Sequence, residues 1–153
     1  DYQIVLIGPV GMSDPDTNVK ALEAQQNIHL LGVRSYQSLP QYIKGFDVAV
    51  IPYRLNTYTE SVFPIKFFEF LATGKPVLVS PLPSLEEFYD EVLVAHDAEE
   101  FIARCEGVIE HGEATSITSQ SRRIELAAEN SWPRRIGELM GHIERKLDER
   151  GLE

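Results

Sequence analysis

A lysine and a glutamate lie three residues apart in a strongly apolar stretch of the chain, SVFPIKFFEFLATGKPVLVS (residues 61–80). Pro64 suits the first turn of a helix, and Gly74 suits the position just past its end, so the sequence predicts a helix between them. Side chains three positions apart share one face of a helix, which places Lys66 and Glu69 side by side. Both would lie in the first turn and a half of that helix.

This pair has the chemistry to bind two parts of a nucleotide. A helix N-terminus offers free N–H groups and partial positive charge, and the ammonium of Lys66 would complete a phosphate site there. The carboxylate of Glu69, one turn further on, could accept two hydrogen bonds from a vicinal diol such as a ribose. The alternative is an exposed ion pair that contributes only about 0.2–0.5 kcal/mol. Periodicity alone favours that alternative.

The same helix carries an apolar stripe that is expected to face the core, because its members recur at helical spacing. The stripe consists of Ile65, Phe68, Leu71 and Ala72.

Short apolar runs alternate with helical patterns through the first two thirds of the chain. Five runs predict buried strands: 2–8, 28–32, 47–53, 76–80 and 91–95. Helices are expected over 18–25, 38–45, 64–74, 97–112, 116–130 and 132–150. Asp97 with Glu100 three residues later forms a capping-box pattern at the start of one of them. The alternation predicts an α/β fold, with a parallel sheet of about five or more strands and helices on both faces.

Ligands of such sheets bind outside the carboxyl ends of the strands. The loops concerned are 8–11, 32–36, 53–63 and 80–83. Arg54 follows the third strand and Arg34 follows the second, and for each a solvated arginine is about as good an interpretation as a site residue.

Composition limits the partners and cofactors. The net charge is −10, and the acidic excess falls in residues 84–153, with seventeen acids and eight bases, whereas residues 1–83 carry seven acids and six bases. A nucleic-acid-binding surface is therefore not expected, but a local cationic pocket for a small anion is. One cysteine and four scattered histidines give no metal-ligand cluster. No apolar run reaches the roughly 20 residues of a membrane span, and the chain opens without a methionine.

The stretch PIKFFEFLATGKPVLVS resembles the nucleotide-binding signature of GT-B fold glycosyltransferases, in the carboxy-terminal domain of the family 4 (group 1) enzymes. The matching positions are Pro64, Lys66, Glu69, Phe70, Ala72, Gly74, Pro76 and Val77. Upstream, residues 27–54 are similar to the strand–helix–strand block of that family. Downstream, AAENSWPRR is similar to its Asn-Ser/Thr-Trp-x-x-Arg element before the last helix. The resemblance covers nearly the whole chain and implies a Rossmann-like domain over residues 1–153.

The resemblance also implies roles for individual residues. Glu69 matches the second glutamate of the Glu-x7-Glu motif of the family, which binds ribose hydroxyls. The first glutamate would fall at Ser61, beside Glu60, so these two are the candidate contacts to the donor sugar. Lys66 matches the lysine that meets the diphosphate, and Arg54 is expected to add to it because the Arg-x4-Lys pair of the family has no clear match. Gly8 should approach the diphosphate, while Arg34 and Tyr36 should lie against the base.

The implied function is donor binding in an enzyme that transfers a sugar from a UDP- or GDP-linked donor to an acceptor, with retention and without a metal or other cofactor. The acceptor site and the catalytic groups would belong to an amino-terminal domain absent from the chain, so the isolated chain should bind nucleotide and be nearly inactive. The resemblance further implies work in bacterial envelope polysaccharide synthesis, in the cytoplasm or peripherally at the inner face of the plasma membrane.

Two alternatives remain open. One is half of a sugar-nucleotide epimerase, which would need catalytic acids and a histidine in an interdomain cleft, and no histidine is placed for that. The other is a non-catalytic α/β interaction or scaffold module. A receiver-like module would need a phospho-acceptor aspartate at the end of its third strand, where this chain has IPYR.

Overall fold

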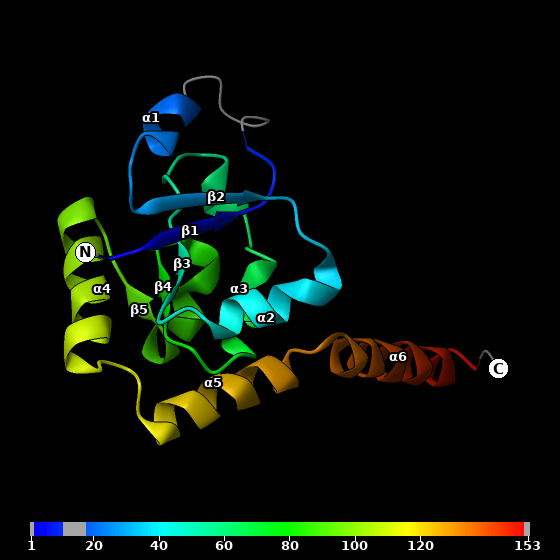
Figure 1. Cartoon of the computed structure of the whole chain (residues 1–153). Helices are drawn as coiled ribbons and strands as arrows, with labels where there is room; N and C mark the ends of the chain where they lie inside the picture. The colour runs from blue at the N-terminus through cyan, green and yellow to red at the C-terminus, as the bar shows by residue number, and fades with distance from the viewer. Residues whose placement is uncertain (1, 11–17, 152–153) are drawn as a thin grey trace. The chain divides into compact units, whose positions relative to one another are not determined.

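The computed structural model describes residues 2–10 and 18–151, and the chain groups into two compact units, Asp1–Tyr42 and Ile43–Glu153. Figure 1 shows the elements of both units. Residues 11–17, which include Gly11 at the end of the loop expected over 8–11, lie outside the described residues.

The first unit contains a pair of parallel strands and short helices. Strand β1 (Ile4–Ile7) pairs with β2 (Ile28–Gly32), with Ile4 opposite Ile28. Helix α1 (Val19–Glu23) begins after Asn18, whose side chain accepts a hydrogen bond from the N–H of Ala21 at 3.1 Å. The 3₁₀ helix η1 (Tyr36–Ser38) follows β2, and helix α2 (Leu39–Lys44) continues across the boundary between the units.

The second unit is built on a three-stranded parallel sheet in the order β3 (Ala49–Ile51), β4 (Val77–Val79), β5 (Leu93–Val94). Between β3 and β4 come the 3₁₀ helix η2 (Thr59–Ser61) and helix α3 (Lys66–Leu71). The 3₁₀ helix η3 (Pro83–Glu91) joins β4 to β5. Three helices follow, α4 (Ala98–His111), α5 (Ile117–Glu129) and α6 (Trp132–Glu149). Helices α3 and α4 both contact β4, and in Figure 1 they lie to either side of it.

The core of the second unit is formed by α3, β4 and the segment after β4. Its fully buried side chains are Phe67, Leu71, Val77, Leu78, Val79, Leu82 and Leu85. Burial of each such side chain contributes about 1.5–3 kcal/mol to folding. The core therefore packs α3 against β4. Helix α3 is the element that carries Lys66 and Glu69.

The ends of the later helices follow the capping residues of the sequence. Asp97 accepts a hydrogen bond from the N–H of Glu100 at 2.8 Å, and Ser116 accepts one from the N–H of Ser119 at 3.1 Å. The Glu100 carboxylate reaches back to the N–H of His96 at 2.8 Å, one residue before the cap. Helix α4 ends at Gly112, where φ is 70°. These contacts satisfy N–H groups that a helix cannot pair internally.

The prediction of one sheet with five or more strands is wrong. The described residues do form five strands, and every neighbouring pair is parallel, but the strands make one sheet of two and one of three. An apolar run predicts a strand without specifying which strand it pairs with. The two sheets also differ in burial, because β4 is buried throughout whereas Ile4 and Leu6 of β1 are exposed. The α/β class is confirmed.

The single donor-binding domain over 1–153 stays a prediction. Among the helices in the described part of the chain, none has an apolar stretch of the length needed to span a lipid bilayer.

Candidate functional site

Helix α3 is shorter than predicted and turns a different face to the core. It begins at Lys66 and ends at Leu71, and the chain then turns through Gly74, which has a φ of 73°. Phe67 and Leu71 are the fully buried pair, one helical turn apart, whereas Ile65 is 76% exposed.

The expected core stripe is therefore only partly correct. Leu71 is buried and Phe68 is half-buried, but Ile65 and Ala72 are exposed. In a segment with phenylalanine at three positions within four residues, spacing alone does not distinguish the two possible faces. The core selects the face that contains Phe67.

Lys66 and Glu69 lie where the sequence analysis placed them, in the first turns of α3. Lys66 is exposed and Glu69 is partly buried. Within residues 2–10 and 18–151, the ion pairs do not include one between these two side chains, and Glu69 is engaged in an interaction of its own. No hydrogen bond or ion pair of the Lys66 ammonium occurs with the described residues. The structure thus does not show the surface ion pair that was the alternative interpretation.

The loop before α3 is held by a compact network that the sequence analysis missed. Thr59 is 6% exposed, and its hydroxyl donates to the carbonyl of Arg54 at 2.9 Å and accepts from the N–H of Asn56 at 2.8 Å. The Asn56 carboxamide oxygen accepts from the N–H groups of Tyr58 and Thr59, both at 3.0 Å. Asn-x-x-Thr is a pattern of local side-chain-to-backbone bonding, so it was a usable signal.

This network positions three of the predicted site residues. Arg54 contributes a carbonyl to it, and Glu60 and Ser61 follow Thr59 directly within η2. All three side chains are exposed. A second bond fixes the end of the loop, because the Ser84 hydroxyl donates to the carbonyl of Val62 at 2.6 Å. Folding of the second unit therefore orders the chain from Arg54 to Glu69, which contains five of the candidate residues.

The other three candidates belong to the first unit. Gly8 has a φ of 141°, a conformation that favours glycine, and its N–H donates to the carbonyl of Gly32 at 3.0 Å. Arg34 donates from Nε to the hydroxyl of Tyr42 at 3.0 Å, and its Cζ lies 5.9 Å from the centre of that ring. Tyr36 is exposed and is engaged in an interaction.

Arg123 is a further residue that the sequence analysis missed. It is 2% exposed and donates to the carbonyl of Gly74 at 2.8 and 3.1 Å and to the carbonyl of Ala114 at 2.7 Å. Burial lowers the pKa of its guanidinium, since the charged form loses hydration, while Glu91 acts in the opposite direction. Arg123 thereby holds the turn that ends α3. An arginine in a helical pattern gives no signal that it will be buried.

The described residues contain no group of three or more His, Cys, Asp and Glu side chains arranged to hold a metal ion. Cys105 is half-buried, and burial raises the pKa of its thiol, with Glu106 acting in the same direction.

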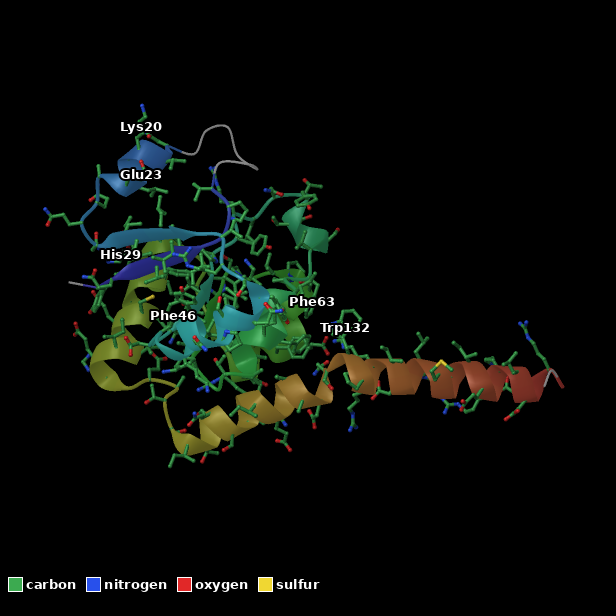
Figure 2. All side chains as sticks on the ribbon, turned by 45° about the vertical axis from the view of Figure 1, so that its right-hand side comes forward. Lys20, Glu23, His29, Phe46, Phe63 and Trp132 are labelled. Atoms are coloured by element: carbon green, nitrogen blue, oxygen red, sulfur yellow. The ribbon has the colours of Figure 1, made fainter. Side chains whose placement is uncertain are left out.

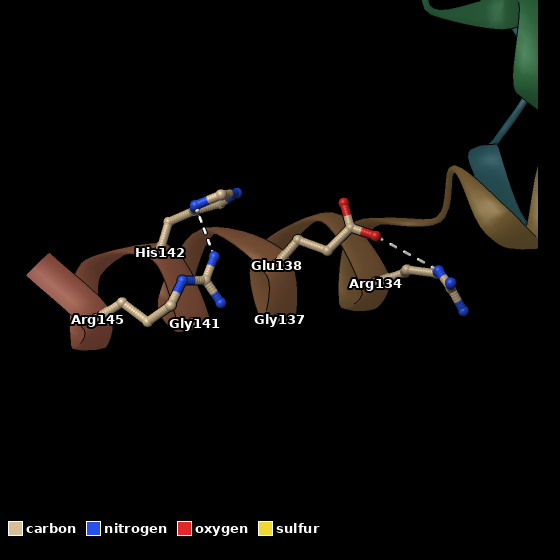
Figure 3. A pocket seen from close by; sticks show the side chains of 6 residues that line it. All are labelled: Arg134, Gly137, Glu138, Gly141, His142 and Arg145. Atoms are coloured by element: carbon tan, nitrogen blue, oxygen red, sulfur yellow. Dashed lines mark hydrogen bonds and ion pairs between the residues drawn. The ribbon is translucent and has the colours of Figure 1, made fainter.

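A shallow hollow of about 390 Å³ lies on α6, lined by Arg134, Gly137, Glu138, Gly141, His142 and Arg145 (Figure 3). Its side chains pair with one another, Arg134 with Glu138 at 3.5 Å and Arg145 with His142 at 2.8 Å. One exposed helix supplies the whole lining, and the hollow includes none of the predicted site residues.

Comparisons with known proteins agree with the sequence pattern. Residues 1–111 match the family described as Glycosyl transferases group 1. The chain is 31% identical over 137 residues to a putative teichuronic acid biosynthesis glycosyltransferase, TuaH, of Bacillus subtilis (strain 168), and the match covers 86% of this chain and 34% of that protein. Among solved structures, Anabaena Alr3699/HepE in complex with UDP superposes with a TM-score of 0.72 at 18% identity, over 95% of this chain and 41% of that one.

The fold is thus an α/β fold shared with part of a protein crystallised with UDP. The chain belongs to the glycosyl transferases group 1 family, because the family match spans most of its length. It spans about a third of the length of the curated relative that it matches.

Proposed function

We propose that this chain is the donor-binding part of a glycosyltransferase that transfers a sugar from a nucleoside diphosphate sugar to an acceptor. The observation that carries the proposal is the exposed Lys66 at the start of α3, whose ammonium has no partner within the described part of the chain. A lysine ammonium next to the core of the unit is well suited to bind a diphosphate. Family membership and the UDP bound in the structural neighbour support the same ligand class.

The remaining site residues are assigned the roles that the family resemblance implies for them. Glu69 would accept hydrogen bonds from the ribose hydroxyls, and Arg54 would add a second positive charge beside the diphosphate. Glu60 and Ser61 would contact the sugar, with Gly8 at the diphosphate and Arg34 and Tyr36 at the base. In the transition state, negative charge develops on the leaving diphosphate, and fixed cations stabilise that charge. Transfer with retention and without a metal is part of the proposal.

The acceptor side is assigned to an amino-terminal domain of a longer enzyme. The chain spans 34% of TuaH and 41% of Alr3699/HepE, which leaves room for such a domain in proteins of this kind. The name of TuaH supports a polysaccharide as the product class. Action in the cytoplasm, at the inner face of the plasma membrane, also belongs to the proposal.

The experiment is isothermal titration of the chain with UDP, GDP and a UDP-sugar. We expect binding of one nucleotide, and we expect Lys66→Ala to weaken it by about 10- to 100-fold, the range for loss of a charge-assisted hydrogen bond. Lys44→Ala is the matched control, because Lys44 is exposed at the end of α2 and the substitution removes the same positive charge.

Glu69 needs two substitutions because it is partly buried and engaged in an interaction. Glu69→Ala should weaken binding strongly, while Glu69→Gln, which keeps the shape and one acceptor oxygen, should weaken it less. Glu87→Ala in η3 is the exposed control. If no nucleotide binds to the folded wild-type chain, the proposal is wrong and a non-catalytic interaction module becomes the better interpretation.

A further inference from the structure

The segment between α5 and α6, Asn130-Ser131-Trp132-x-x-Arg135, has no role in the function proposed above. In the structure its arginine contacts the helix that carries the candidate site. The Cζ atom of Arg135 lies 5.2 Å from the centre of the Phe68 ring. Phe68 lies between Lys66 and Glu69 on α3. A guanidinium over an aromatic face at this distance is attracted by the ring quadrupole.

The orientation of Arg135 is fixed from the core side. Its Nη2 donates to the Asn130 carboxamide oxygen at 2.9 Å, and the Asn130 amide nitrogen donates in turn to the carbonyl of Leu126 at 2.9 Å. Leu126 belongs to the same hydrophobic cluster as Phe67. The chain of contacts thus begins in the core, passes through the end of α5, and reaches the Phe68 ring.

Phe68 connects this arginine to the loop before α3. The Phe63 ring stacks on it, with centroids 5.5 Å apart and planes at 22°, and the Phe88 ring meets it edge-on at 5.6 Å. Phe63 follows shortly after the two residues predicted to contact the donor sugar, Glu60 and Ser61. A shift of the Phe68 ring would therefore displace both this loop and the neighbouring side chains on α3.

We propose that Arg135 is a positioning residue of the donor site, which acts through Phe68 and Phe63 to set the position of Lys66 and Glu69 relative to the turn at 60–61. This inference rests on the function proposed above. It assigns to the Asn-Ser-Trp-x-x-Arg segment the role of holding the site helix in its binding geometry.

The test is titration of UDP into the full chain and its variants at position 135. Arg135→Ala should lower UDP affinity about threefold to tenfold, because without this contact α3 occupies its binding geometry for a smaller fraction of the time. Arg135→Lys keeps a cation but not the planar guanidinium, so it should restore part of the lost affinity, whereas Arg135→Met keeps only the length of the side chain and should not. Arg134→Ala is the matched control, because Arg134 is exposed and its ion pair is with Glu138 on the same helix.

A second measurement separates positioning from stability. Urea unfolding should show that every variant is folded before urea is added. In two-dimensional NMR, Arg135→Ala should shift the backbone amide signals of Lys66 and Glu69, whereas Arg134→Ala should not. When Arg135→Ala is combined with Phe68→Leu, the loss of affinity should be smaller than the sum of the two single losses, because each substitution removes the same Arg135–Phe68 contact.

The outcomes distinguish the two proposals. If the wild type binds UDP and Arg135→Ala binds it equally well, the positioning role is overturned and the proposed function stands. If lysine restores no more affinity than methionine, the effect is one of packing and the positioning role through the cation is overturned. If the wild-type chain binds neither UDP nor GDP, both proposals fail.

Discussion

The side chain of Arg123 shows how a single buried cation can order a site that it does not touch. Its guanidinium donates to the carbonyls of Gly74 and Ala114, and so ties α5 to the turn that ends α3. Loss of the side chain would leave these carbonyls without their donor, and the Gly74 carbonyl is in a buried position. Such unsatisfied acceptors cost far more than an exposed ion pair contributes.

We expect Arg123→Ala to lower the free energy of unfolding by about 2–4 kcal/mol, from the lost hydrogen bonds and the cavity left behind. Urea unfolding at pH 7 measures this change. The neighbouring Arg122 is the control, because it is exposed and pairs at the surface with Glu91 and Glu125. Arg122→Ala should leave the unfolding midpoint close to that of the wild type, and equal losses for both variants would contradict this assignment.

At the scale of single residues, the sequence analysis identified candidate ligand-binding residues by their type and spacing. It missed residues that hold the backbone through hydrogen bonds. A proline, a glycine and helical spacing located Lys66 and Glu69 on one helix, and the family resemblance selected them as site residues. Arg123 could not be found in the same way, because it bonds to Gly74, which is distant in the sequence. Thr59 was missed although the local Asn-x-x-Thr pattern was a usable signal. The predicted roles of the site residues stay predictions.

The start of α4 carries a carboxylate, Glu100, whose pKa is shifted by its contacts. The Glu100 carboxylate accepts from the N–H and from the ring Nδ1 of His96, at 2.8 and 2.9 Å, and Arg104 lies 3.7 Å away. These contacts lower the pKa of Glu100 below its ordinary value of 4.5, with the backbone bond to His96 as the largest cause.

A carboxylate whose pKa is lower in the folded state stabilises the fold above its ordinary pKa, and this contribution disappears as the pH falls through the lower value. The difference in free energy of unfolding between the wild type and Glu100→Gln should therefore be present at pH 7 and shrink progressively below pH 4.5. Urea unfolding at a series of pH values measures it. A difference that is constant over the whole series would contradict the role of the charged form.

Helices were predicted better than sheets, for a physical reason. Helix ends depend on local contacts, so Asp97, Ser116 and the glycine after α4 marked the boundaries of α4 and α5 within a residue or two. Strand pairing depends on hydrogen bonds between segments far apart in the chain, so five correct strand locations still led to an incorrect single sheet. The core face of α3 was misassigned because phenylalanines occur on more than one face of this helix, so spacing did not identify the buried one.

At the scale of the whole molecule, α6 differs from every other long helix of the second unit, because none of its residues is buried. Its apolar side chains are exposed, namely Trp132, Ile136, Leu139, Met140, Ile143 and Leu147. Beyond Arg135, the side-chain ion pairs and hydrogen bonds of the described part of α6 stay within the helix itself.

We expect a chain that ends after Ile136 to retain the stability of the second unit, with a urea midpoint near that of the wild type, because the removed part of α6 contributes no buried side chain. The control is a chain that ends at Ser116, which also loses α5 with Leu126, Ala127 and Arg123 and should not fold. Circular dichroism and urea unfolding follow both. A large loss of stability in the chain that ends after Ile136 would contradict the peripheral role of α6.

Trp132 is the only tryptophan of the chain, and it lies 75% exposed at the start of α6, one turn before Arg135 (Figure 2). Indole fluorescence shifts to shorter wavelength when the ring loses water. Any molecule that covers this turn, whether a ligand, another part of a longer chain or a second copy, will therefore change the emission of the unlabelled protein. The fluorescence of Trp132 can therefore be used to detect binding at the start of α6 without a label.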